Sequence, residues 1–249
     1  TLAVTSRAGR HAGWLSVSHA PRRRTVIVNV SASLARAIPL VLSRVRHAFD
    51  LACDPAPIVE ALGALAAARP GLRVPGTCDG FELAVRAVIG QQVSVAGART
   101  LLGRLAMAFG TPLDDEFPRG LSRLFPSAAG LAVRTADELR TVGLTVARAR
   151  TLVDLAQAVT RGEIVLYPGA DVEGTRKALE AIRGIGPWTS AYIAMRALGW
   201  PDAFPDNDLG VLRAMGETRA ASARLRSEAW RPWRAYAVMH LWHHPTPIR

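Results

Sequence analysis

The stretch at residues 179–190, with the sequence LEAIRGIGPWTS, constrains this chain more than any other. An apolar helical run stops at Gly184 and Gly186, and a second run begins at once with Pro187. Both glycines can adopt a positive φ without a Cβ clash, which allows a tight hairpin between two helices. Pro187 suits the first position of a helix, where its missing N–H needs no partner. The pattern therefore predicts a helix-hairpin-helix unit.

The second helix of this unit begins with free backbone N–H groups, which form an anion site together with the positive end of the helix dipole. The chain carries 31 Lys and Arg against 20 Asp and Glu, a net charge of +11, and Lys177 is its only Lys. A GC-rich genome can explain the preference for Arg over Lys, but not the net excess of cations. Arg forms bidentate bonds with phosphate, so the expected anion is a nucleic-acid phosphate held by the amides of Gly184 and Gly186 and by Arg183.

The rest of the chain indicates an α+β fold that is mostly α. Alternating or β-branched runs predict strands at 2–5, 13–18 and 25–30, and 33–48 reads as a helix capped by Ser33 and interrupted by Pro39. From Asp54 onward, Gly and Pro divide apolar segments into about eight helices with no further strand. We expect a small N-terminal antiparallel sheet and helix domain at 1–53, truncated at its start, and an all-α helix-hairpin-helix domain at 54–249. The subdomains of the latter are expected at about 79–198 and at 54–78 with 199–249.

Beyond the hairpin, the segment 204–215 reads FPDNDLGVLRAM and places acidic residues before another helical run. A hairpin followed by Pro-x-x-Asp-Leu resembles the helix-hairpin-helix DNA glycosylases, specifically the 3-methyladenine DNA glycosylase II (AlkA-like) family. Three more segments carry the resemblance: FELAVRAVIGQQVSVA at 81–96, FDLACDP at 49–55 and WRPWRAYAVMHLW at 230–242. The resemblance covers most of the chain from about residue 49 and implies hydrolysis of the N-glycosidic bond of alkylated bases, such as 3-methyladenine and 7-methylguanine, in double-stranded DNA during base excision repair.

Asp208 is the catalytic carboxylate that this resemblance implies, because a fixed anion stabilises a sugar with oxocarbenium character and can orient or deprotonate water. Asp is also a favoured N-cap, so a purely structural role for Asp208 stays open, and Asp206 is the second choice if the register is off by two. Trp188, Tyr192 and Trp242 match the family's base pocket, where a cationic base gains from cation–π attraction. The alternative for these rings is ordinary core packing, which we assign to Trp230 and Trp233 and, on the last helix, to His240.

The bifunctional relatives carry a Lys just after the hairpin, where this chain has Trp188. We therefore expect a monofunctional enzyme without AP lyase activity. The segment 89–94 resembles the turn that enters the duplex in this family, with Gln91 and Gln92 contacting DNA and Gln92 standing where some members have Leu. Alternatively, both glutamines lie on a polar face between two helices.

No cofactor is expected, apart from a monovalent cation that the resemblance places on the backbone carbonyls of Glu180, Ile182 and Ile185. Cys53 and Cys78 are too few for the four-cysteine iron–sulfur cluster of some relatives, and the histidines lack zinc-ligand spacing.

No apolar stretch near the N-terminus approaches the roughly 20 residues of a membrane span. We expect a cytoplasmic, nucleoid-associated bacterial monomer. Thr1 is expected to be a truncation or cleavage point, behind which some relatives carry an Ada-type alkyl-transfer and regulatory region.

Two other functions stay open. One is a non-catalytic helix-hairpin-helix module that binds DNA or senses damage, for which a carboxylate such as Asp208 would have no use. The other is a glycosylase for deaminated bases.

Overall fold

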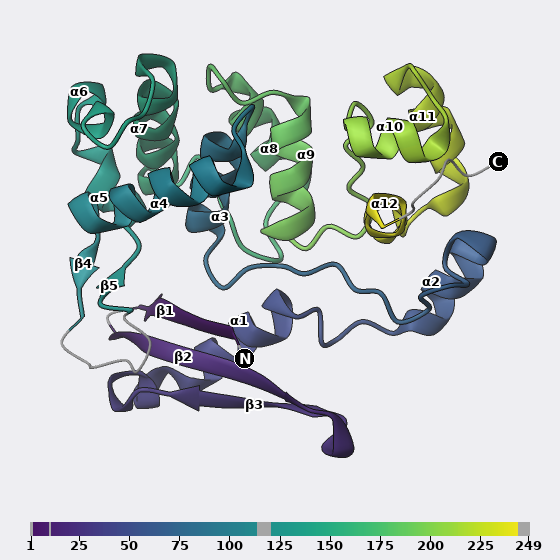
Figure 1. Cartoon of the computed structure of the whole chain (residues 1–249), viewed down its shortest axis with the longest axis horizontal. Coiled ribbons are helices and arrows are strands. Elements are labelled where there is room, and N and C mark those ends of the chain that lie inside the picture. Colours follow the sequence, from purple (N-terminus) through teal and green to yellow (C-terminus); the bar gives the residue numbers. More distant parts are fainter. Residues whose placement is uncertain (1, 10, 114–120, 244–249) are drawn as a thin grey trace.

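The computed structural model describes residues 2–9, 11–113 and 121–243 (Figure 1). Its N-terminal part is a three-stranded antiparallel sheet of β1 (Leu2–Ala8), β2 (His11–Ala20) and β3 (Thr25–Val30), in that order. Leu15 of β2 pairs with Val4 on one side and Val30 on the other. Burial along β2 alternates, because successive side chains point to opposite faces, and the buried face packs on α1 (Ile38–Ala48). The three predicted strands are confirmed.

The segment that follows the sheet differs from the prediction at both of its marked residues. It begins as a 3-10 helix, Ala32–Ala37, and becomes α-helical only in α1. Ser33 is not a helix cap, since it lies inside the 3-10 helix with its hydroxyl 2.7 Å from that of Ser31. Pro39 lies in the first turn of α1, where a missing N–H removes no helical hydrogen bond, so it begins the helix rather than interrupting it.

The remainder is helical, as predicted, but more finely divided (Figure 1). After Asp54 the described residues form eleven α-helices where about eight were expected, and a short ladder of β4 (Thr111–Pro112) and β5 (Arg123–Leu124) where no strand was expected. Four of these elements, α5, α6, β4 and β5, are only two to five residues long, too short to leave a periodic pattern. The helices are α2 (Pro55–Leu62), α3 (Gly80–Gly90), α4 (Val95–Phe109), α5 (Ala128–Ala132), α6 (Ala136–Arg140), α7 (Val146–Thr160), α8 (Val172–Ala181), α9 (Pro187–Arg196), α10 (Leu209–Met215), α11 (Ala220–Ser227) and α12 (Arg234–Trp242).

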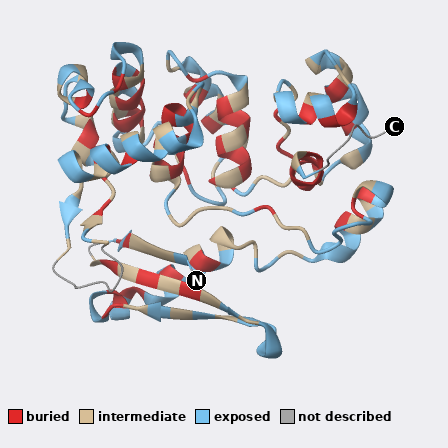
Figure 2. Cartoon of the chain, in the orientation of Figure 1, coloured by how far each residue is buried: buried red, intermediate tan, exposed pale blue. Residues whose placement is uncertain are grey.

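The helical part has two hydrophobic cores that meet at α9 (Figure 2). The first is built by α3 to α9 and includes Leu152 and Ile193, both fully buried. The second joins α2 to α10, α11 and α12, so Ile58 packs with residues much later in the chain, and it takes Met195 from α9. Tyr192 touches both cores. Helix α9, which begins at the hairpin, therefore stands where the two cores join.

Candidate DNA-binding and catalytic site

The hairpin between α8 and α9 uses its two glycines differently. Gly184 has a φ of +97°, as predicted, and a Cβ there would lie 2.4 Å from the Oγ1 of Thr151. That hydroxyl, on α7, donates to the carbonyl of Arg183 at 2.7 Å, and this hydrogen bond ties the hairpin turn to α7. Gly186 does not need a positive φ, because it is extended at φ −98° and serves as the N-cap of α9. One left-handed residue is enough to reverse the chain.

The hairpin leaves its polar groups at the surface. Gly184, Gly186 and Pro187 are all exposed, and Pro187 is the first residue of α9, as predicted. Arg183 is also exposed, and its guanidinium has no hydrogen bond or ion pair with any residue in the described ranges. The amides at the start of α9 and this guanidinium are available to an anion.

Asp208 is half-buried and holds three hydrogen bonds. It is the N-cap of α10, where its Oδ1 accepts from the backbone N–H of Val211 at 2.8 Å. The same oxygen accepts from Nε1 of Trp242 at 2.9 Å, and Oδ2 accepts from Nε1 of Trp188 at 2.7 Å. The capping role is therefore real, and it coexists with two contacts that no cap requires. Asp206 instead accepts from Nε of Arg224 at 2.6 Å, so Asp208 is the carboxylate bound to the indoles.

The aromatic rings come to this carboxylate from two helices. The rings of Trp188 and Tyr192, one turn apart on α9, stack with centroids 5.3 Å apart and an interplanar angle of 9°. Trp242 reaches the same carboxylate from the end of α12. The packing roles of Trp230 and Trp233 are confirmed, since both lie against the second core. His240 is buried on α12 as predicted, and this burial lowers its pKa.

The two glutamines after α3 do different things. The side-chain amide of Gln91 donates to the carbonyl of Gly184 at 3.0 Å and to Oγ1 of Thr189 at 2.9 Å. Its side chain therefore bonds to the hairpin, and its expected contact with DNA stays a prediction. Gln92 is exposed with a φ of +53°, so its expected contact with DNA stays a prediction.

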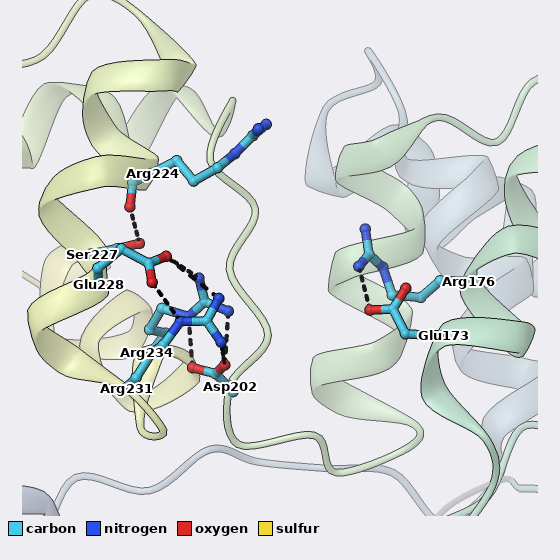
Figure 3. Close-up of polar contacts among 8 residues, drawn as sticks. All are labelled: Glu173, Arg176, Asp202, Arg224, Ser227, Glu228, Arg231 and Arg234. Carbon is cyan, nitrogen blue, oxygen red and sulfur yellow. Dashed lines mark hydrogen bonds and ion pairs between the residues drawn. The ribbon is translucent and has the colours of Figure 1, made fainter.

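Sequence reasoning missed a buried ion pair between the segment that precedes Asp208 and the first residue of α12 (Figure 3). Asp202 accepts from Nε and Nη2 of Arg234 at 2.6 and 2.8 Å, and Arg231 adds a third bond at 2.7 Å. The nearby backbone N–H of Ala235 donates to the carbonyl of Pro201 at 2.8 Å. These bonds attach the segment that leads into Asp208 to the helix that ends in Trp242. No periodic pattern marks such a pair in the sequence.

Metal-ligating side chains are scattered. Within the described part of the chain, no three His, Cys, Asp or Glu side chains gather as a metal site requires. Burial raises the pKa of the Cys53 thiol, and that of Cys78 to about 11. None of the described helices has the length and apolar character needed to cross a membrane.

Both parts of the chain match known protein families. Residues 2–79 match the AlkA N-terminal domain, and residues 85–235 match the HhH-GPD superfamily base excision DNA repair proteins. The chain belongs to the AlkA family. It is 40% identical over 236 residues to the DNA-3-methyladenine glycosylase 2 of Escherichia coli K12, a match that covers 94% of this chain and 82% of that protein. The family resemblance and the fold class predicted from the sequence are confirmed.

One further relative and one solved structure are similar to this chain. A Mycobacterium tuberculosis protein named "Probable bifunctional transcriptional activator/DNA repair enzyme AlkA" is 42% identical over 210 residues, which cover 80% of this chain and 42% of that longer protein. The solved structure of the 3-methyladenine DNA glycosylase from Archaeoglobus fulgidus superposes with a TM-score of 0.78 at 21% identity, and covers 96% of this chain and 85% of its own. At that identity the likeness speaks for the fold alone.

Proposed function

We propose that this AlkA-family chain is a monofunctional DNA-3-methyladenine glycosylase II, which hydrolyses the N-glycosidic bond of alkylated bases in double-stranded DNA for base excision repair. The observation that carries the proposal is the carboxylate of Asp208, held by two indole N–H groups and a helix N-terminus. A module that only binds DNA has no use for an anion in that position, which repels phosphate. The relation to the Escherichia coli glycosylase supports the substrate class.

The chemistry requires a fixed negative charge. Alkylation at N3 or N7 makes a purine cationic, so the base leaves without strong help from a general acid, and positive charge develops on the sugar. Asp208 stabilises that charge, and its three hydrogen bonds keep both oxygens in place, so little reorganisation accompanies the reaction. Its remaining lone pairs can orient or deprotonate the attacking water.

The aromatic rings select the base. The stacked pair of Trp188 and Tyr192 offers an electron-rich face to an extruded cationic base, worth roughly 0.5–2 kcal/mol of cation–π attraction. Trp188 also occupies the place of the Schiff-base Lys of bifunctional relatives, and Lys177 is exposed on α8, before the hairpin. The product is therefore an abasic site in an intact strand.

The hairpin holds the DNA backbone without reading sequence, which suits an enzyme that must inspect any sequence. Its amides and Arg183 bind phosphate, and a monovalent cation binds the carbonyls of Glu180, Ile182 and Ile185. The Ile182 carbonyl accepts the N–H of Ile185 at 3.0 Å and keeps a second lone pair for such a cation. The enzyme acts as a monomer in the cytoplasm, at the nucleoid, and it requires no cofactor. The proposed activity does not depend on whether an Ada-type region is attached.

Base release from methylated duplex DNA tests the proposal. Wild type, Asp208→Asn and the matched control Asp206→Asn are compared, with the strands analysed before and after alkali. Asp208→Asn is expected to lower the rate at least about 100-fold while DNA affinity is kept or raised, because a negative charge near phosphate is removed.

Four results would contradict parts of this reading. Normal excision by Asp208→Asn would refute the mechanism, and strand breaks before alkali would refute the absence of lyase activity. Tight DNA binding by wild type without any base release would favour the damage-sensing module. Release of uracil or hypoxanthine in preference to methylated purines would favour a glycosylase for deaminated bases.

A further inference from the structure

The side chain of Gln91 connects the turn that follows α3 with the hairpin between α8 and α9. Gln91 is the first residue of the turn at 91–93, directly after α3, and its amide nitrogen donates to Gly184 in the hairpin and to Thr189 in the first turn of α9. An amide nitrogen carries two hydrogens, and both acceptors lie at 2.9–3.0 Å, so both are used within the protein. The side-chain N–H groups of Gln91 therefore serve the relative position of these two loops.

Helix α7 fastens the same two loops from a second side. The guanidinium of Arg148 donates to the backbone carbonyl of Gln91. Thr151, one turn further along α7, donates to the carbonyl of Arg183 in the hairpin. The turn, the hairpin and α7 thus form one hydrogen-bonded unit in which Gln91 makes the only side-chain bridge recorded between the turn and the hairpin among the described residues.

Gln92, the residue that follows, has an unfavourable backbone conformation. Gln92 has a φ of +53°, in the left-handed region that non-glycine residues rarely occupy, and it is exposed. Such a conformation persists only where the surrounding structure holds it. The turn is held at both of its ends. Gln91, at its start, bonds to the hairpin and to α7. Ser94, just after its end, caps α4 by accepting from the N–H of Gly97 at 3.1 Å. The turn is thereby held with Gln92 at its exposed tip.

We propose that Gln91 is a positioning residue that sets the turn carrying Gln92 at a fixed offset from the phosphate-binding hairpin. When the hairpin engages the backbone, Gln92 is already placed to fill the stack that the extruded nucleotide leaves. This inference rests on the proposed function, which assigns the hairpin to phosphate, and on the resemblance of the segment 89–94 to the turn that enters the duplex.

The proposal predicts a dependence on how the damaged base is held. Filling the stack helps only when the base must first be unpaired and unstacked, and that cost is smallest for a base that is already unpaired. The excision of a lesion in a single-nucleotide bulge therefore does not need a side chain to fill the vacated stack. Loss of the Gln91 bridge should slow excision of the paired lesion and spare the bulged one.

Two substitutions at Gln91 remove the bridge in different ways. Gln91→Met keeps the length of the side chain without its donors, and Gln91→Glu replaces both donors with acceptors facing the Gly184 carbonyl. The matched control is Gln157→Met, which removes a single bond to the Ala132 carbonyl at 3.3 Å, on α7 and away from both loops. Thermal unfolding of each variant shows that it folds.

The first measurement is single-turnover excision of a methylated purine from paired and bulged duplexes. Each Gln91 variant is expected to lose about tenfold on the paired duplex, the loss of two neutral hydrogen bonds, and to stay within about twofold of wild type on the bulge. The control should keep wild-type rates on both. Equal losses on both duplexes, or no loss on the paired one, would overturn the proposal.

The second measurement does not depend on catalysis. A 2-aminopurine next to the paired lesion brightens when its neighbour leaves the stack, and the Gln91 variants should show less brightening at saturating protein. Unchanged brightening would overturn the positioning role. If the Gln91 variants brighten less but the wild type releases no base, the positioning role is upheld and the proposed glycosylase activity is refuted. The failure of one proposal can therefore be told from the failure of the other.

Discussion

The substitution Asp202→Asn tests the buried ion pair between Asp202 and Arg234. The carboxylate of Asp202 and the guanidinium of Arg234 are only 10% and 7% exposed, and they meet through two bonds of 2.6 and 2.8 Å (Figure 3). Removing one partner of a buried pair costs about 3–5 kcal/mol. Here Arg234 keeps a second partner, the carboxylate of Glu228 at 3.2 Å, which compensates part of its charge. Asn keeps one acceptor oxygen, which places the expected loss near the lower end, about 3 kcal/mol.

Urea and thermal unfolding measure this loss. In a chain of this size 1 kcal/mol corresponds to roughly 2–4 °C, so the melting temperature should fall by about 6–12 °C. The control is Glu163→Gln, which breaks the Arg161–Glu163 pair, whose side chains are 55% and 54% exposed, and should leave the midpoint unchanged. If Asp202→Asn also leaves it unchanged, the charge of Arg234 is compensated without Asp202, and the pair does not hold α12 in place.

Three further predictions follow from the site and its supports. Gly184→Ala should cost about 1–3 kcal/mol in urea unfolding, because its φ is +97° and a Cβ meets a hydroxyl at 2.4 Å, whereas Gly186→Ala, at φ −98° with open space, should leave stability unchanged. Trp242→Phe removes one donor to the carboxylate of Asp208, which we propose is catalytic, a hydrogen bond worth about 1.5–3 kcal/mol, so single-turnover excision should fall roughly 10- to 150-fold without loss of folding. Burial lowers the pKa of His47 below its ordinary 6.5, so the unfolded chain takes up this proton at a higher pH than the folded chain. Stability should therefore decline as the pH falls below about 6.5, and His47→Gln should flatten that decline in urea titrations.

Local rules predicted the parts of this fold whose causes are local. The strands β1 to β3 follow from alternation, and the hairpin follows from Gly184 and Pro187, whose backbone preferences hold in any context. Gly186 shows the limit of such rules, because glycine permits a positive φ without requiring one. Ser33 shows another, since its hydroxyl found a neighbouring Ser rather than a helix N–H.

The remaining features depend on where helices pack. The carboxylate of Asp208 joins Trp188 and Trp242 only because α10 and α12 pack beside α9, and the sequence reached that grouping through family resemblance rather than periodicity. No resemblance or pattern indicated that Gln91 turns toward the hairpin, or that Asp202 meets Arg234. In each case the partner is fixed by tertiary packing between residues far apart in the sequence.

The two indole hydrogen bonds on Asp208 also bear on how such an enzyme evolves toward new damage. Trp188 and Trp242 both belong to the base pocket that we propose, and both donate to the carboxylate that we propose acts on the sugar. A mutation that reshapes the pocket at either tryptophan therefore disturbs the rate as well as the preference. Tyr192 stacks on Trp188 without a recorded bond to the carboxylate, so it is the position where natural selection can alter base preference at the least cost to turnover.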